Sequence, residues 1–480
     1  MTATRYTHRH IARLTVEAET PLAVGTGKGS DILTDAPVAK DVNGLPYIPA
    51  TSIAGVLRHA MGYADNKTDG NPFGYTDGAD NDDSGHGSDI IFTDAVMVGK
   101  EGKALDGIQD IEWEDEFYRA FQDLPIRQHV RIDDKGTAED KGKFDNEVVY
   151  KGTRFVFEIE LVSDNDNDND NHIENAIKHL RYCTLRIGGG TRKGYGKLKI
   201  VKCQQASLVL SKPEDLERYL KKSSSLAEYW EGFTKISAIG SLDDSKWTHY
   251  QLKLKPLDFF MFGSGMGDSD ADNVYVSELV VCWGSDDKPY IDKDTEDKPQ
   301  KRVLIPGSSV KGALAHRTAY HYNKIKKRFA GNCNPEDVTG SYNEAVAAIF
   351  GKKADDGKFT RGRLVIDDVI KGQAEPKATT VAQSKTTSKI FYHNKIDQFT
   401  GGTMDGALFQ EKVIYDKDTE YEINIYVEKD ALNDEDIEKA FKQSLHDICT
   451  GLLPLGGITN RGNGIFTGTA TENDKQLWEK

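Results

Sequence analysis

The sequence predicts an α+β protein of two tandem ferredoxin-like domains that carry long insertions and thumb-like hairpins. Two observations support this fold class. Landmarks of residues 1–203 return in the same order in residues 247–480. In each half the expected elements run strand, helix, strand, strand, helix, strand, which is the order of a split βαβ unit and of RNA-recognition domains. Residues 204–246 are left as a connector with a short helix.

The internal repeat consists of seven matched segments. They pair residues 35–41 with 272–278, 47–55 with 304–312, 73–74 with 350–351, 91–94 with 365–368, 132–133 with 396–397, 144–149 with 409–414, and 188–196 with 456–464. A single matched segment is weak evidence. Seven matched segments in the same order in both halves indicate duplication of a whole domain.

Each element is predicted from periodicity and from its end signals. Alternating apolar residues predict strands at 13–18, 251–255, 155–161 and 421–427. Helices are expected at 52–61 and 309–322, capped by the Ser and Thr residues before them, and at 172–184 and 434–450. Ser211 and Pro213 predict a capped helix in the connector. The polar stretches 133–144 and 397–409 lie between strand-like ends and predict projecting hairpins.

The composition excludes several classes of protein. Asp and Glu number 77 against 62 Lys and Arg, a net charge of -15, so a polybasic clamp is excluded and any nucleic acid must meet a local basic surface. We expect the acidic excess in the inserts at 64–89, 164–171 and 286–297. No apolar run is long enough for a membrane span, and residues 1–13 lack the apolar core of a signal peptide. The five scattered cysteines form no zinc pattern, so we expect small core residues in a reducing cytoplasm.

Basic residues accompany two repeated features that favour anions. The Gly-rich segments 188–196 and 456–464 follow helices, which argues against a Walker loop or a dinucleotide fold. Their glycines would let the backbone approach a phosphate, with charge from Arg192, Lys193 and Arg461, and a tight turn is the alternative. The predicted helix starts form the second feature, where free N–H groups favour an anion and plain capping is the alternative. Their residues are Thr51, Ser52 and Arg58, and Ser308, Ser309, Lys311 and Arg317.

Asp35 and Asp272 occupy matched loop positions. A lone Asp in a loop is usually a turn former. The sharper interpretation is that each carboxylate orients an RNA 2′-hydroxyl as a base or holds a divalent ion.

Together these motifs resemble the RAMP superfamily, specifically the Cas-seven-type backbone subunits of type III CRISPR effector complexes. The resemblance covers nearly the whole chain apart from the connector. Two fused copies resemble the double-backbone subunit of a type III-D variant. It implies two RAMP domains that grip crRNA, with each hairpin acting as a thumb that displaces one base pair of the guide–target duplex.

The resemblance also implies that each half cuts guide-paired target RNA once, by metal-assisted transesterification. The catalytic and metal-holding residue would be Asp35 in the first half and Asp272 in the second, where Asp268 and Asp270 are alternatives. The implied ion is divalent, with magnesium expected. The implied partners are crRNA, target RNA and other effector subunits, namely further backbone subunits and a large polymerase- or cyclase-like one, and no membrane.

Two other functions remain open from the sequence. The chain would be a crRNA-binding scaffold if neither carboxylate acts. It would be a guide-processing ribonuclease if a histidine served as general acid or base, and the candidates are His8, His10, His59 and His129.

Overall fold

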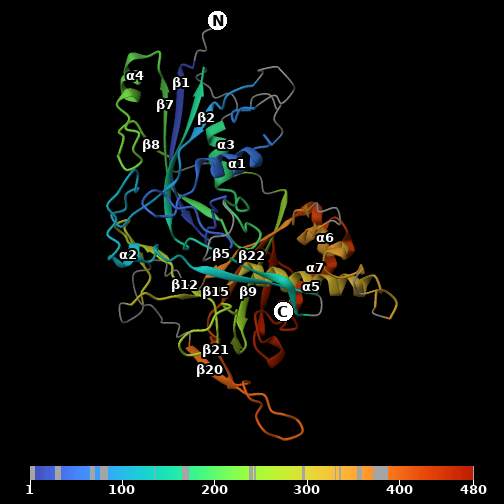
Figure 1. Ribbon diagram of the computed structural model, residues 1–480. Helices are drawn as coiled ribbons and strands as arrows, with labels where there is room; N and C mark the ends of the chain where they lie inside the picture. The colour runs from blue at the N-terminus through green and yellow to red at the C-terminus, as the bar shows by residue number, and fades with distance from the viewer. Residues whose placement is uncertain are drawn as a thin grey trace.

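The computed structural model of the chain describes residues 6–27, 34–64, 71–75, 85–133, 136–164, 172–236, 240, 242, 245–293, 298–329, 331–334, 337–353, 359–370 and 387–478. Most of the Asp- and Asn-rich inserts at 64–89 and 164–171 lie outside these residues. The two largest sheets follow one another along the long axis of the molecule (Figure 1).

The first half folds around one antiparallel sheet of order β2-β6-β1-β7, which agrees with a split βαβ unit, and its last strand continues past residue 203 to Val209. Short β3 also pairs with β6. The elements are β1 (His8–Ala18), α1 (Ala50–Ala60), β2 (Ile90–Phe92), β3 (Val96–Met97), α2 (Glu116–Arg119), β4 (Ile126–Ile132), β5 (Ala138–Glu147), β6 (Arg154–Ser163), α3 (His172–Leu180) and β7 (Leu198–Val209).

The second half, residues 247–480, has the same sheet order, β18-β22-β9-β23, with β24 added at the edge. Its elements are β9 (Trp247–Pro256), β10 (Phe259–Phe260), β11 (Asn273–Val274), β12 (Ser277–Glu278), β13 (Val281–Trp283), β14 (Pro289–Ile291), β15 (Arg302–Ile305), α5 (Gly307–Ile325), η2 (Gly340–Tyr342), α6 (Glu344–Phe350), β16 (Lys352–Lys353), β17 (Phe359–Thr360), β18 (Leu364–Ile366), β19 (Val369–Ile370), β20 (Thr387–His393), β21 (Phe409–Tyr415), β22 (Tyr421–Glu428), η3 (Lys429–Leu432), α7 (Glu435–Cys449), η4 (Thr459–Arg461), β23 (Phe466–Glu472) and β24 (Lys475–Gln476).

The α+β class and the predicted strands and helices are therefore confirmed. Each half buries its own core, with residues such as Leu14, Phe157 and Ile177 in the first and Leu252, Ile425 and Phe441 in the second. The two hairpins are formed by β4–β5 and β20–β21, and the second projects from the far end of the molecule (Figure 1). Cys203 and Cys449 are buried, and the other three cysteines are half-buried.

The connector packs against the first half. Its helix α4 (Pro213–Leu220) is followed by β8 (Thr234–Lys235), which pairs with β7 and extends the first sheet. Trp230 and Phe233 form a small core with Ile11 and Leu208 of that sheet. The chain beyond residue 203 thus adds to the first sheet before it enters the second half.

The predicted Ser and Thr caps were wrong. α1 and α5 begin after Pro49 and Pro306, and α4 begins after Lys212, none with a side-chain cap. At α1 and α5, carboxylates from the neighbouring strand connections replace the expected caps. Asp94 Oδ1 accepts from the N–H of Ala50 at 2.7 Å, and Asp368 Oδ1 accepts from the N–H of Gly307, also at 2.7 Å. Sequence proximity could not reveal these partners, because they lie more than forty residues away.

We call the contact between the two halves the seam. The β13–β14 hairpin of the second half packs into the first core through Val281 and Ile291. Its backbone joins the first half, since the N–H of Val281 donates to Lys151 O at 2.9 Å. The halves therefore share apolar packing and backbone hydrogen bonds. Within the described ranges, no helix is long and apolar enough to cross a membrane.

Candidate functional site

Asp35 lies against the base of the β4–β5 hairpin. Its Oδ2 accepts a hydrogen bond from the N–H of Asp145 at 3.0 Å, and its own N–H donates to Asp145 Oδ1 at 2.8 Å. Hydrogen bonds from the N–H of Asp35, and from the side chains of Thr34 and Gln128, lower the pKa of Asp145. Asp35 is exposed, and its Oδ1 has no hydrogen-bond partner in the part of the chain that the structure describes.

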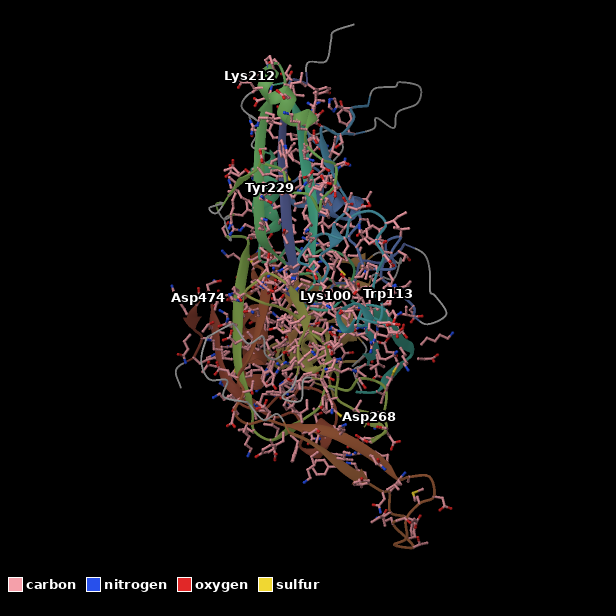
Figure 2. The ribbon with its side chains drawn as sticks, turned by 90° about the vertical axis from the view of Figure 1, so that its left-hand side faces the viewer. Lys100, Trp113, Lys212, Tyr229, Asp268 and Asp474 are labelled. Carbon is pink, nitrogen blue, oxygen red and sulfur yellow. The ribbon has the colours of Figure 1, made fainter. Side chains whose placement is uncertain are left out.

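Asp272 occupies the matching place in the second half. Its Oδ2 accepts from the N–H of Gln410 at 2.8 Å, and Gln410 aligns with Asp145. The alternatives Asp268 and Asp270 are both paired with Lys412, at 3.0 and 3.2 Å. Figure 2 places Asp268 near the base of the projecting β20–β21 hairpin. Asp272 is thus the carboxylate whose geometry repeats that of Asp35.

A stacked histidine and phenylalanine sit next to each carboxylate's backbone partner. His129 pairs with Phe144 across β4–β5, with ring centroids 5.0 Å apart. His393 pairs with Phe409 across β20–β21, also at 5.0 Å. Asp145 directly follows Phe144, and Gln410 directly follows Phe409, so each candidate carboxylate binds the backbone beside one of these stacks.

The Gly-rich segments bring a cation onto each stack. Lys193 Nζ lies 4.1 Å from the centroid of the Phe144 ring, and the Arg461 guanidinium lies 5.0 Å from that of Phe409. Arg461 also pairs with Glu411 at 3.1 Å, whereas burial lowers the pKa of Lys193. Two predicted RNA-binding residues are therefore brought to the two hairpin bases, at equivalent positions.

Close packing requires the first glycine of each Gly-rich segment. Gly188 and Gly456 have φ of 90° and 96°, and a Cβ there would lie 2.5 Å from Ala23 O and 2.4 Å from Met261 O. Both positions need glycine for a tight turn against the segment that follows the opening strand of each half. A tight turn therefore explains why these two positions are glycine. The anion-binding hypothesis depends instead on the basic residues that follow in each segment.

Arg192, Lys193 and Lys311 gather at the seam. Arg192 Nε donates to Gly362 O, and a Cβ on Gly362 would lie 3.6 Å from Lys311 Nζ. Burial, and then the charges of Arg192 and Lys193, lower the pKa of Lys311 to about 8. No carboxylate pairs with Lys311 in the described part of the chain. Unpaired cations in a half-buried place favour an anion such as phosphate.

The other predicted RNA-binding residues include the starts of α1 and α5, and α5 also carries Lys311. Thr51 and Ser52 are in the first turn of α1, and Ser308 and Ser309 are in the first turn of α5. The first backbone N–H of each helix already donates to a carboxylate, that of Asp94 for α1 and that of Asp368 for α5. Two predicted arginines have protein partners, since Arg58 donates to Tyr63 O at 3.0 Å and Arg317 pairs with Asp447.

Buried ion pairs hold the seam together. Arg127 of β4, only 5% exposed, donates to Glu278 Oε2 at 2.8 Å and to Asp368 Oδ2. Arg186 and Lys197 both pair with Asp367, the latter at 3.1 Å. Because all three basic groups come from the first half and all three acids from the second, the two halves are electrostatically complementary here.

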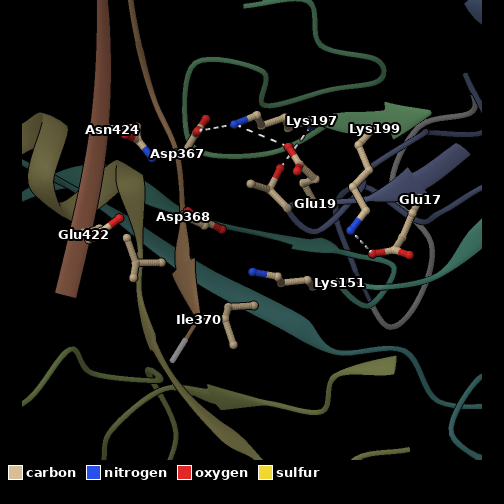
Figure 3. Close-up of a pocket in the computed structure, with 12 residues that line it drawn as sticks. Glu17, Glu19, Lys151, Lys197, Lys199, Asp367, Asp368, Ile370, Glu422 and Asn424 are labelled. Carbon is tan, nitrogen blue, oxygen red and sulfur yellow. Dashed lines mark hydrogen bonds and ion pairs between the residues drawn. The ribbon is translucent and has the colours of Figure 1, made fainter. Parts of the chain in front are cut away.

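A polar cavity of about 240 Å³ lies beside these pairs (Figure 3). Its lining residues are Glu17, Glu19, Thr20, Lys151, Lys197, Lys199, Asp367, Asp368, Val369, Ile370, Glu422 and Asn424. Carboxylates outnumber lysines in this lining, and Lys197 and Lys199 are already paired with Glu19 and Glu17. The cavity does not fit an RNA phosphate.

A family model described as the RAMP superfamily matches residues 15–199 and 253–467, one stretch in each half. The chain belongs to the RAMP superfamily. Membership implies a CRISPR-associated RNA-binding protein, and RAMP proteins can be ribonucleases. No curated protein matches the chain.

The two RAMP halves supply only part of the ligand set that a divalent metal ion needs. No group of three or more His, Cys, Asp or Glu side chains that would hold a metal ion occurs among the residues described. The free Oδ1 of Asp35 fits a magnesium ion that takes its remaining ligands from RNA phosphates and water, which is how Mg²⁺ commonly binds at phosphate sites.

The sequence offers His129 only as a candidate general acid or base, and the two stacked pairs and the seam arginines were missed. The pairs His129–Phe144 and His393–Phe409 had a usable signal, because each histidine lies three residues before a matched Ile–Asp pair. Arg127 and Arg186 had no such signal in the sequence, because the acids that pair with them lie in the other half of the chain. Burial, then the charge of Lys193, lowers the pKa of His129 to about 4, so this ring is neutral near pH 7.

Proposed function

We propose that this RAMP protein is a tandem backbone subunit of a type III CRISPR ribonucleoprotein, of the type III-D variant kind. Residues 1–203 and 247–480 would act as two RAMP backbone domains joined by the connector 204–246. The observation that carries the proposal is the repeated hairpin base, where a carboxylate binds the backbone beside a cation-covered His–Phe stack.

Guide RNA would bind along the hairpin bases and the seam. Lys193 and Arg461 offer charge beside an aromatic ring at equivalent positions, which suits a phosphate next to a stacked base. Arg192 and Lys311 would contact a phosphate between them, and the absence of a carboxylate partner of Lys311 among the residues described supports this role. The helix starts, with Thr51, Ser52, Ser308 and Ser309, and the arginines Arg58 and Arg317 remain secondary proposals.

Target RNA would be cut at Asp35 and Asp272. The carboxylate takes the proton of a ribose 2′-hydroxyl, whose oxygen attacks the adjacent phosphorus. The bond from phosphorus to the 5′-oxygen of the next nucleotide breaks, and that oxygen takes up a proton from water. The products are a 2′,3′-cyclic phosphate and a 5′-hydroxyl. A base displaced by the hairpin would permit the in-line geometry that a regular A-form duplex forbids.

Each carboxylate is already oriented for this task by the hydrogen bond from Asp145 or Gln410. A bound divalent ion, with magnesium proposed, would neutralise charge on the phosphate. Asp35 and Asp272 would each supply one oxygen ligand to it.

The test uses the assembled complex with guide and a labelled target RNA. Asp35→Ala should remove one set of cleavage products and Asp272→Ala another, and the double variant should leave the target intact while it still binds. Asp268→Ala is the control in the second half and should keep all products. Unchanged cutting by the double variant would leave only the scaffold function.

The scaffold function has one observation in its favour, confined to the second half. The carboxylates of Asp35 and Asp272 each accept one backbone hydrogen bond, but the N–H of Asp35 also donates to Asp145 Oδ1, so the loop that carries Asp35 is the more firmly held of the two. The guide-processing function has less support, because the neutral, half-buried His129 does not suit a general acid.

A further inference from the structure

Gln128 of β4 lies between the first proposed active site and a loop of the second half. It pairs with Asp145 across the β4–β5 hairpin, and its Nε2 donates to Asp145 Oδ2 at 3.1 Å. The N–H of Asp145 in turn donates to Asp35 Oδ2 at 3.0 Å. On its other side Gln128 contacts Gly265 of the second half, in keeping with the place of β5 beside that half in Figure 1. We call the contact between Gln128 and Gly265 the junction.

The junction is closely packed. Gly265 has a φ of 80°, and a Cβ there would lie 2.7 Å from Gln128 Cβ and 3.0 Å from Gln128 Cγ. This backbone conformation and this close approach both require glycine. Because no space is left at the contact, the loop 263–272 cannot shift towards the hairpin without moving Gln128.

The loop on the other side of the junction carries Asp272 and is folded tightly on itself. The N–H of Ser264 donates to Val274 O at 2.8 Å, which ties the two ends of the loop together. A Cβ on Gly267 would lie 2.8 Å from Asp272 O, so the start of the loop packs on the backbone of the proposed catalytic residue. A displacement of Gly265 should therefore reach Asp272 within a few residues.

The amide of Gln128 serves position rather than stability. Its Oε1 is buried and accepts no hydrogen bond from the residues described. Burying an unpaired acceptor costs stability, so such a group calls for another explanation. The matching residue of the second hairpin is Tyr392, which pairs with Gln410 and is 68% exposed. Within the described residues, a hairpin base is thus covered in this way only in the first half.

We propose that Gln128 is a positioning residue that couples the two proposed active sites of this chain. It holds Asp145, and through Asp145 the Asp35 carboxylate, while its aliphatic part supports the loop that carries Asp272. Residues in contact along such a packed and hydrogen-bonded chain are coupled energetically. The inference rests on the proposed function and deepens it, because cleavage at one site then depends on residues of the other half.

The test adds one methyl group at the junction, in the assembled complex with guide and labelled target RNA. Gly265→Ala should slow cleavage at the first site by at least about threefold, although Gly265 belongs to the second half. Gly263→Ala is the matched control in the same loop and should leave the first site unchanged, because nothing lies within 4 Å of its Cβ position. Single-turnover rates are read separately for the two sets of products, and the affinity for the target should not change.

Hydrogen exchange on the full-length chain gives a second readout that needs no cleavage. Gly265→Ala should speed exchange of the N–H of Asp145 by at least about threefold, and Gly263→Ala should not. A wild-type complex that leaves the target uncut would count against the proposed function, and the exchange rates would then decide the coupling alone.

The outcomes that overturn the coupling are separate from that one. Where the wild-type complex cuts, first-site cleavage that Gly265→Ala leaves unchanged overturns it, and where it does not cut, unchanged exchange at Asp145 does so. An equal effect of Gly263→Ala also overturns it. Should Gly265→Ala fail to fold in thermal melts, Gln128→Ala replaces it. That variant should speed exchange at the N–H of both Asp145 and Gln410, and an effect on Asp145 alone would overturn the coupling.

Discussion

Asp35 and Asp145 are joined by two hydrogen bonds, in which the backbone N–H of each residue donates to the carboxylate of the other. The bond to the Asp35 carboxylate is 3.0 Å long and the bond to the Asp145 carboxylate is 2.8 Å long. The hairpin base and the loop that carries Asp35 are thereby fixed to one another. The second half keeps only the first of these bonds, from Gln410 to Asp272. The two proposed active sites should therefore differ in how precisely they hold their carboxylate.

Asp145→Ala should slow target cleavage at the first site by about tenfold, because it frees the loop that carries Asp35. Single-turnover rates on saturating target measure this, and the affinity for the target should not change. Gln410→Ala is the matched variant in the second half. It should leave the second site nearly unaffected, since only the backbone of Gln410 is used there. Equal effects of the two variants would contradict this difference.

Arg127→Leu should destabilise the folded chain by about 3–5 kcal/mol, because it leaves the buried Glu278 and Asp368 without their cation. Urea unfolding measures the change. Arg131→Leu is the control in the same strand, and it should cost about 0–1 kcal/mol, since the pair of Arg131 with Glu139 is exposed. A small effect of Arg127→Leu would mean that the two halves do not depend on the seam.

Lys311→Met should weaken guide RNA binding and reduce the salt dependence of that binding by about one phosphate contact. Filter binding over a range of salt measures both quantities. Because the pKa of Lys311 is lowered to about 8, the wild-type affinity should also fall between pH 7 and pH 9, as this ammonium loses its proton. Lys326→Met, at the C-cap of the same helix and paired with Asp436, should change neither quantity appreciably.

Stability should fall as the pH is lowered from about 6.5 to about 4, in part because of His129. Its pKa is about 4 in the folded chain and near 6.5 when unfolded, so the unfolded chain takes up the proton first in this window. Urea unfolding at pH 7 and pH 5 measures the loss, and His129→Gln should lose less. A His129 pKa near 6.5 in the folded chain, read by NMR, would exclude this contribution.

The sequence predicted what is local or repeated. Strand periodicity placed the strands of both halves, and the repeat paired Asp35 with Asp272 before their matching backbone bonds were known. It could not supply the partners Asp94 and Asp368 at the helix starts, because an acid distant in the chain replaced the expected local cap. The helix position of Arg317 predicts an RNA contact, and tertiary packing pairs this arginine with Asp447, a partner that the sequence does not indicate.

The most direct test of the account is a structure of the assembled complex with guide and uncut target RNA. The measurement is the distance from the carboxylates of Asp35 and Asp272 to the nearest target 2′-hydroxyl oxygen. We expect roughly 2.6–3.2 Å at both sites, with a displaced base alongside. Both carboxylates directed away from any ribose, with the RNA following another surface, would contradict it.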